Sequence, residues 1–339
     1  MNDEKVISYD VTQRFLEADA QANGEIGISF VVVNFNMAGL VYRLVEAIRR
    51  EVAGKFSHEI ILGDNSTDPE FRVDERYRGV SEVRVVQLPA NEGYVKSAAS
   101  LLNLTRNKYV VMLHPDVDFQ AQCISRLIDF MEVHPLAGIV SPNLIYPDGK
   151  PCKIRLRLAT PLTECKRLLN LITRGVLRRN LVKDELLWDR QADVAADMTM
   201  SVCMVIRKTM LDKIGPIHVP LWSYYFNDWL GLKARRGGYS CHYLRDAVAI
   251  HYERFADASL YSRKADSTYK ATPIPVEGVM QKDHFVFLRS AHSPGKVFVF
   301  KWIMIMEYLF LLVTTLPRYR ERQQQAIAYR KALKLIYSA

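Results

Sequence analysis

The first 250 residues alternate short apolar runs with amphipathic stretches, and this alternation is the strongest constraint on the fold. The run ISFVVVN (28–34) is continuous and β-branched, as expected for a strand that is buried on both faces. After Gly39, apolar residues recur every four positions, which indicates one face of a helix. Similar runs follow at 59–64, 83–88, 109–113 and 137–140, with helical stretches from about Val95 and over about 121–132. The pattern predicts an α/β protein with a Rossmann-like, mostly parallel sheet and helices on both faces.

Polar loops follow three of these strands: NFN after the first, GDNSTD after the second and HPDVD after the fourth. In open α/β sheets, ligands bind beyond the carboxyl ends of the strands. Asp116 and Asp118 lie in the last of these loops, one residue apart, where two carboxylates can face one cation. Carboxylate oxygens suit Mg²⁺ or Mn²⁺, which bridge substrate phosphates. Capping of the following helix is the alternative role for this pair.

The net charge of +9 is concentrated in two segments that are also rich in apolar residues. In the segment 162–182 apolar residues fall at helical spacing with basic residues around them, which predicts either a helix on an anionic membrane surface or an ordinary solvated helix. The segment 297–317 is more apolar, but Lys301 and Glu307 interrupt it, and its uncharged run of 308–317 is too short to span a bilayer. We expect it to lie in or on the membrane, or else to form a core helix. Three arginines that follow could meet anionic headgroups: Arg318, Arg320 and Arg322.

Several classes of protein are disfavoured by the sequence. The five cysteines are an odd number without a C-x-x-C pair, which indicates reduced thiols. The polar N-terminal segment carries no apolar signal region, so the cytoplasm is the expected compartment. The basic residues lie in oily stretches rather than among exposed stacking aromatics, which argues against a nucleic-acid partner. NFNMAG stands where a nicotinamide-dependent oxidoreductase would carry G-x-G-x-x-G.

Eight motifs occur in a characteristic order: FVVVNFN, EIILGDNSTD, NEGYVKSAAS, MLHPDVDF, YPDGKPCKIRLR, SVCMVIRKTMLDKIG, YYFNDWLGLKARRGGY and AVAIHY. Their order and spacing resemble the inverting family 2 glycosyltransferases, especially the bacterial rhamnosyltransferase-like branch. The resemblance implies a GT-A fold over 26–255, with a nucleotide-sugar half (26–142) and an acceptor half (143–255) that contains a basic helical insert at about 160–185. An N-terminal extension (1–25) and an amphipathic helical, membrane-associating region (256–339) complete the expected organisation.

The resemblance also assigns residues to the donor nucleotide sugar. Asp64 would grip the base or ribose, although GDNSTD is also a strong turn sequence. Asn91, Gly93 and Lys96 lie in the loop that passes near the donor, where a solvated lysine is the alternative for Lys96. The remaining donor-binding candidates follow the first and fourth strands: Asn34, Asn36, His114 and Asp116. The implied metal ligands for Mg²⁺ or Mn²⁺ are Asp116 and His251, with Asp118 as an additional carboxylate.

The catalytic base expected from the resemblance is Asp228, because the family's acid pair is replaced here by Asn227 followed by Asp228. Inverting transfer is an in-line displacement in which the acceptor hydroxyl loses a proton as it attacks the sugar. A helix N-cap is the alternative for Asp228. Acceptor-binding candidates are Asn227, Trp229, Arg155 and Arg157.

The implied reaction moves a sugar from a nucleotide diphosphate donor, dTDP-rhamnose or a UDP-sugar, to a lipid-linked or surface-polysaccharide acceptor. The expected location is the inner face of the cytoplasmic membrane. The alternative is an inactive domain that binds nucleotide or scaffolds a membrane-bound complex, for which His114 and Asn227 are the best support.

Overall fold

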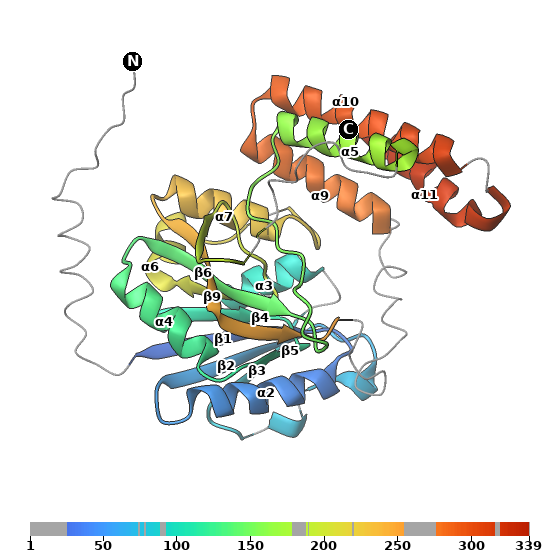
Figure 1. Ribbon diagram of the computed structural model, residues 1–339. Helices are drawn as coiled ribbons and strands as arrows, with labels where there is room; N and C mark the ends of the chain where they lie inside the picture. The colour runs from blue at the N-terminus through green and yellow to red at the C-terminus, as the bar shows by residue number, and fades with distance from the viewer. Residues whose placement is uncertain are drawn as a thin grey trace, which may run out of the picture.

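The computed structural model describes residues 26–73, 75–77, 79–88, 93–177, 188, 190–218, 220–253, 276–315 and 319–338. Within these residues one nine-stranded sheet forms the centre of the protein, in the order β3-β2-β1-β4-β8-β6-β9-β5, with β7 paired to β9 (Figure 1). The strands are β1 (Gly27–Asn34), β2 (Ser57–Asp64), β3 (Val83–Gln87), β4 (Tyr109–Leu113), β5 (Val117–Phe119), β6 (Ala137–Ile145), β7 (Val194–Ala196), β8 (Cys203–Arg207) and β9 (Ser240–His251).

The first four strands run parallel, and their sequences explain why. β1 pairs with β2 and β4, and β2 pairs with β3, all in parallel register. Every residue of β4 is buried, as are residues 28–34 of β1, because helices cover both faces. The prediction of an α/β protein with a mostly parallel sheet is therefore confirmed. Beyond β4 the sheet becomes mixed, since β8 runs antiparallel to β4 and β6, while β6 and β9 are parallel.

Helices cover the two faces of the sheet in separate groups. On one face α2 (Ala38–Val52) and α4 (Cys123–Val133) bury their apolar sides in a common core. On the other face lie α3 (Tyr94–Leu102), α6 (Lys208–Ile214) and α7 (Phe226–Arg236). Two short 3-10 helices, Pro69–Phe71 and Glu75–Tyr77, follow β2. The five cysteines are free thiols, four of them buried and Cys165 exposed.

Four further helices gather beyond the second face of the sheet (Figure 1): α5 (Pro161–Leu177), α9 (Val276–Ala291), α10 (Pro294–Thr315) and α11 (Tyr319–Ser338). A third buried apolar cluster joins α9, α10 and α11 to the sheet domain, with Phe287 from α9, Phe300 from α10, Ile336 from α11 and Leu232 from α7, while α5 packs on α10. The C-terminal helices thus share a core with α7, against which α9 packs. The predicted domain limits stay predictions: residues 1–25 and 254–275 lie outside the described residues, and β6 crosses the expected division at 142.

The charges within α10 point to neighbouring helices. Lys301 donates to the carbonyl oxygen of Tyr337 at 3.0 Å, and Arg167 of α5 forms a two-pronged ion pair with Glu307. The segment expected to be interrupted by these charges is therefore one continuous helix of 22 residues. Among the described residues it is the one helix that is long and apolar enough to cross a membrane, by length and composition alone.

The outward side of α10 carries apolar side chains at helical spacing. Five of them are between 43% and 61% exposed: Phe298, Trp302, Met306, Leu309 and Val313. The successive separations of four, four, three and four positions place them on one face of the helix. Of the arginines expected to flank this segment, Arg318 lies outside the described residues, while Arg320 and Arg322 fall in the first turn of α11.

Candidate active site

The carboxyl ends of β1 and β2 are locked together by buried polar side chains. Asn34 and Asp64 face each other in the parallel register, and the Asn34 amide donates to Asp64 at 3.2 Å and to Ser66 at 2.8 Å. Asp64 also accepts from the backbone N–H groups of Ser66 at 3.0 Å and Val73 at 3.2 Å. Asn36, with a positive φ of 54°, accepts from the backbone N–H groups of Thr67 and Asp68. These predicted donor-binding side chains thus also shape the loops beside the sheet edge.

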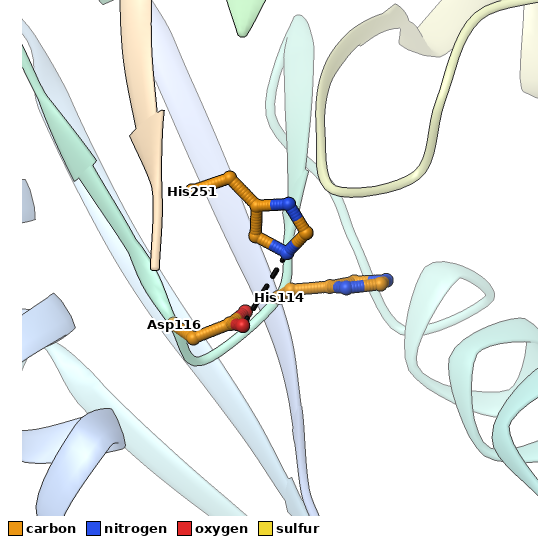
Figure 2. Close-up of side chains that lie close together, drawn as sticks. All are labelled: His114, Asp116 and His251. Atoms are coloured by element: carbon orange, nitrogen blue, oxygen red, sulfur yellow. Dashed lines mark ion pairs between the residues drawn. The ribbon is translucent and has the colours of Figure 1, made fainter. Parts of the chain in front are cut away.

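A cluster of three side chains lies where β4 and β9 end. One ligand atom from each of His114, Asp116 and His251 lies within 4.8 Å of the other two, and Figure 2 shows the ring of His251 directed at the Asp116 carboxylate. The two are 3.3 Å apart between Nε2 and Oδ2. The backbone N–H of Glu253 donates to Asp116 Oδ2 at 3.0 Å, which fixes the carboxylate. Two imidazoles and a carboxylate in this arrangement could hold a divalent metal ion.

Burial and mutual charge set the protonation of this cluster. Burial lowers the pKa of His114 to about 4, so its imidazole is neutral at pH 7. Burial also acts against the charged form of His251, but the hydrogen bonds and charges of Asp116 and Cys152 together outweigh it and raise the His251 pKa to about 9. For Asp116, burial is opposed by His251 and His114, which hold the pKa of the carboxyl below its usual range. Without a cation, His251 and Asp116 therefore form an imidazolium–carboxylate pair.

Asp118, expected as an additional metal ligand, is not brought to this cluster. Its carboxylate lies 3.2 Å from Arg50 of α2 and accepts from the backbone N–H of Phe119. The reason is local: β5 begins at Val117, opposite His251 on β9, while Asp116 stays in the preceding turn. The two acids thus do not share a strand face despite their spacing. His114, expected only at the donor, takes the third place in the cluster.

The expected base, Asp228, lies in the first turn of α7 with only 6% of its surface exposed. Burial raises the pKa of its carboxyl, and the positive charge of Arg155 acts in the opposite direction. The Arg155 guanidinium forms an ion pair and hydrogen bond with this carboxylate. A buried carboxylate with a raised pKa and a cationic neighbour is the environment expected for a general base. The structure thus brings together two residues that the sequence assigned separately to catalysis and to the acceptor.

Ser201 connects the histidine cluster to the start of α7. Its hydroxyl lies 3.4 Å from Nε2 of His114, and its backbone N–H donates to the side-chain oxygen of Asn227 at 3.2 Å. Ser201 therefore links the cluster to the residue that directly precedes Asp228. Sequence reasoning missed Ser201, although it begins the motif SVCMVIRKTMLDKIG. Tyr94 was missed as well, and its ring packs edge-to-face on His114 with centroids 5.3 Å apart.

The remaining candidates are distributed around this site. Gly93 has φ 88° at the start of α3, where an added Cβ would lie 2.5 Å from the carbonyl oxygen of Trp222. Lys96 is exposed in the first turn of α3, and Asn91 lies outside the described residues. Trp229 is partly buried on α7 beneath Lys233, at 5.4 Å from that ammonium. Arg157 lies 3.6 Å from Asp197, away from Asp228.

A sheet with a candidate metal cluster where two of its strands end, and a buried carboxylate at the start of a helix that packs on it, is an arrangement suited to group transfer. The sequence profile described as Glycosyl transferase family 2 matches residues 29–215, which is more than half of the chain. The chain therefore belongs to this family of glycosyltransferases, and its fold is GT-A. This confirms the resemblance at the level of the family, whereas the rhamnosyltransferase-like branch stays a prediction.

Solved structures agree on the fold. A mannosyltransferase from Pyrobaculum calidifontis, in complex with GDP-Man and Mn²⁺, aligns with a TM-score of 0.51 at 12% identity and covers 96% of this chain and 91% of its own. GalNAc-T7, with UDP, GalNAc and Mn²⁺, aligns with a TM-score of 0.50 at 14% identity over 68% of this chain. The chain spans 44% of the GalNAc-T7 chain. No curated protein matches the sequence.

Proposed function

We propose that this protein transfers a sugar from a nucleotide diphosphate donor to a hydroxyl of a glycan or lipid-linked glycan, with inversion and with the help of a divalent cation. One observation carries the proposal: Ser201 joins the His114–Asp116–His251 cluster to the helix start that bears Asn227 and Asp228. A cation site and a buried base on one side of the sheet edge match the two needs of the reaction. One group must take a proton from the acceptor, and positive charge must face the leaving diphosphate.

Asp228 would take the proton of the acceptor hydroxyl as its oxygen attacks the sugar carbon. Its burial raises the pKa and so increases basicity, while Arg155 keeps the carboxylate ionised and oriented. Arg155 would also be the first side chain to meet an acceptor that approaches Asp228, since a third of it is exposed. Trp229 and Asn227 lie on the same helix turn and supply a stacking surface and a fixed amide for the acceptor.

The donor set of the cluster favours Mn²⁺ over Mg²⁺. Mg²⁺ binds almost entirely through oxygen, whereas His114 and His251 offer imidazole nitrogens beside the Asp116 carboxylate. A divalent cation here would counter the charge that builds on the departing diphosphate. The neutral state of His114 leaves it ready to bind a cation, and His251 would first have to release its proton. Asp118, paired with Arg50, is not needed for this role.

The donor is proposed to be a nucleoside diphosphate sugar, because the structures of similar fold hold UDP with GalNAc in one case and GDP-Man in the other. The resemblance to the rhamnosyltransferase-like branch adds dTDP-rhamnose to these candidates. Asp64, held by three hydrogen bonds at the end of β2, is the proposed contact for base or ribose. Lys96 at the start of α3 is the proposed phosphate contact.

A panel assay tests the function. UDP-, GDP- and dTDP-sugars are incubated with the protein, Mn²⁺ and a lipid-linked or oligosaccharide acceptor, and nucleoside diphosphate release is measured. We expect release with one donor class, loss in chelator, and loss in Asp116→Ala. Asp118→Ala is the matched control, since it removes a neighbouring carboxylate outside the cluster. Nucleotide binding without turnover for every donor would instead support the alternative of an inactive scaffold.

We further propose that the protein works at the inner face of the cytoplasmic membrane, held there by the outer face of α10. Water-exposed Phe298, Trp302 and Met306 are an unfavourable surface unless it is covered. The nearby helices α9–α11 carry exposed cationic residues, including Lys282, Lys296 and Arg330, which suits anionic headgroups. A membrane would also hold the acceptor if this is lipid-linked.

Substitution tests this better than truncation, because removing α10 would also remove Phe300 and Met304 from the third core. Phe298→Ser with Trp302→Ser should lower binding to vesicles of phosphatidylcholine and phosphatidylglycerol at least tenfold, since each inserted ring contributes about 1.5–3 kcal/mol. Val133→Ser is the control, since Val133 is an exposed apolar residue on α4, away from the outer face of α10 in sequence and on a different helix. Equal binding of the double variant and the control would contradict the membrane proposal.

A further inference from the structure

Asp283 of α9 gathers three consecutive backbone N–H groups of the loop before α7. Its carboxylate accepts from Trp222 at 2.9 Å, from Ser223 at 2.8 Å and from Tyr224 at 2.9 Å. Only 1% of Asp283 is exposed, so these bonds form in a dry environment where they are strong. A side chain in the C-terminal helical region therefore fixes the backbone of a loop that lies 60 residues earlier in the chain.

The other side of this loop is held by the start of α3. The carbonyl oxygen of Trp222 accepts from the backbone N–H of Val95 at 3.0 Å. Gly93 lies against the same residue so closely that an added Cβ would contact the Trp222 carbonyl oxygen at 2.5 Å and its ring at 2.7 Å. Trp222 is thus clamped between α9 and the expected donor loop.

The loop ends at Tyr225 in a conformation that needs support. Tyr225 adopts the left-handed region with φ 62°, which is unfavourable for a residue with a side chain, and α7 begins directly after it. Its ring stacks on His284 of α9 with centroids 4.5 Å apart and planes 5° apart, and on Phe287 at 5.7 Å. Burial lowers the pKa of His284, so this imidazole stacks in its neutral form. The support for the start of α7 therefore again comes from α9.

We propose that Asp283 and His284 are positioning residues for transfer: they hold the loop 222–225, and with it the start of α7, in the conformation that directs Asp228 to the acceptor. This inference rests on the proposed role of Asp228 as the base. Asp228 lies three residues after Tyr225, in the first turn of the helix whose start the clamp defines. A displacement of about 1 Å of a reacting group can lower a rate by about 100-fold. The helix α9 is accordingly part of the catalytic architecture.

The test uses Asp283→Asn in the full chain. Asparagine keeps the size, but it offers one acceptor oxygen and adds an N–H₂ group against three N–H donors. Hydrogen exchange of the amides of 222–224 should accelerate at least tenfold, while the affinity for Mn²⁺ alone stays within twofold because the cluster lies on other elements. The kcat of transfer should fall about 10- to 100-fold. Asp212→Asn is the control, because Asp212 is an exposed carboxylate on α6. This substitution should leave the exchange rates, the Mn²⁺ affinity and the kcat unchanged.

Two results with Asp283→Asn would contradict the proposal. Unchanged exchange at 222–224 would overturn the clamp itself. Faster exchange with unchanged kcat would overturn the positioning role. If Asp283→Asn does not fold, His284→Leu removes the stacking on Tyr225 without introducing a buried charge, and the same measurements and criteria apply to it. Lack of transfer by the unmodified protein would refute the proposed function and the positioning role with it, whereas the exchange data would still show whether the clamp exists.

Discussion

Replacing Asp228 by asparagine is expected to lower transfer by about 10²–10⁴-fold while the fold and the affinity for donor are retained. That range is the usual contribution of a positioned general base, and it corresponds to about 3–5 kcal/mol of activation free energy. Asparagine has the same shape and can still occupy the first turn of α7, but its amide cannot take a proton. The catalytic loss should therefore greatly exceed any structural loss.

The contacts of Asp228 limit how far Asp228→Asn should lower the free energy of unfolding. Removing one partner of a fully buried ion pair costs about 3–5 kcal/mol, because the other charge is left unsolvated. Arg155 is 33% exposed, so water can reach its guanidinium once the carboxylate is gone. We therefore expect a decrease of about 1–2 kcal/mol in the free energy of unfolding, to which the lost charge at the helix start contributes about 0.3–1 kcal/mol.

Single-turnover transfer with saturating donor and Mn²⁺ is the appropriate assay, because it reports chemistry rather than product release. Glu51→Gln provides a matched control: it also removes a buried carboxylate, but on α2, where Glu51 accepts from the backbone N–H of Ile124 at 2.9 Å. Near-normal single-turnover rates for Asp228→Asn would refute the assignment of the base. The N-cap of α7 is Tyr225 rather than Asp228, so loss of folding in this variant would mean that the buried ion pair with Arg155 is required for the fold.

Arg155 gives a second view of the same group. Because its positive charge lowers the pKa of Asp228 against the effect of burial, Arg155→Gln should raise that pKa further. A base acts only when it is deprotonated, so the acidic limb of the kcat profile should move to higher pH in this variant. An unchanged acidic limb would show that another group governs the profile.

Three further predictions concern the metal, the clamp and pH. Asp116→Ala should weaken Mn²⁺ binding by at least tenfold in calorimetry, while Asp118→Ala leaves the affinity unchanged. Mn²⁺ binding to the unmodified protein at pH 7–8 should release about one proton from His251, because the pKa of His251 is raised to about 9. Gly93→Ala should lower the free energy of unfolding by about 1–3 kcal/mol, measured in urea, because of its positive φ and the contact with Trp222. Burial lowers the pKa of His284 to about 3. The unfolded chain therefore binds a proton at this histidine as pH falls below about 6.5, whereas the folded protein does not. The free energy of unfolding should then decrease by up to about 1.4 kcal/mol per pH unit, and less steeply in His284→Leu.

Much of the sheet edge could be predicted from local sequence. The apolar β-branched runs predicted β1, β2, β3 and β4 with limits close to those observed; for β1 and β4 the reason is that a strand buried on both faces must be apolar throughout. Asn34 and Asp64, both predicted to bind the donor, end neighbouring parallel strands and lie opposite each other in the register. The hydrogen bond between these two side chains could not be predicted, because it depends on the path of the loop after β2.

The composition of the metal cluster depended on a pairing that no local pattern reveals. β5 has only three residues and pairs antiparallel with β9, more than 100 residues later, which places Val117 opposite His251. This pairing, rather than the D-x-D spacing, decides that Asp116 meets His251 while Asp118 meets Arg50. Only the resemblance to a family identified His251 in advance.

The amphipathic pattern of α10 was misleading for a related reason. Charged residues interrupt the apolar surface of a helix only if their side chains lie on the same face as the apolar side chains. Lys301 and Glu307 instead face α11 and α5, where they find a carbonyl oxygen and Arg167. The outer face therefore lacks these two charges, and its exposed apolar residues extend from Phe298 to Val313 rather than over the run 308–317 alone.

The arrangement of the C-terminal helices relates the two proposed surfaces to each other. Phe287 and Leu288 of α9 share one buried cluster with Phe300 and Met304 of α10, so α9 lies between the exposed apolar face of α10 and α7. The same α9 presents Asp283 and His284 to the loop before Asp228. Because protein cores are closely packed, a displacement of α10 would be transmitted to α9 and α7. A lipid surface bound by α10 would therefore be connected through α9 to the start of α7, where we propose that Asp228 meets its acceptor.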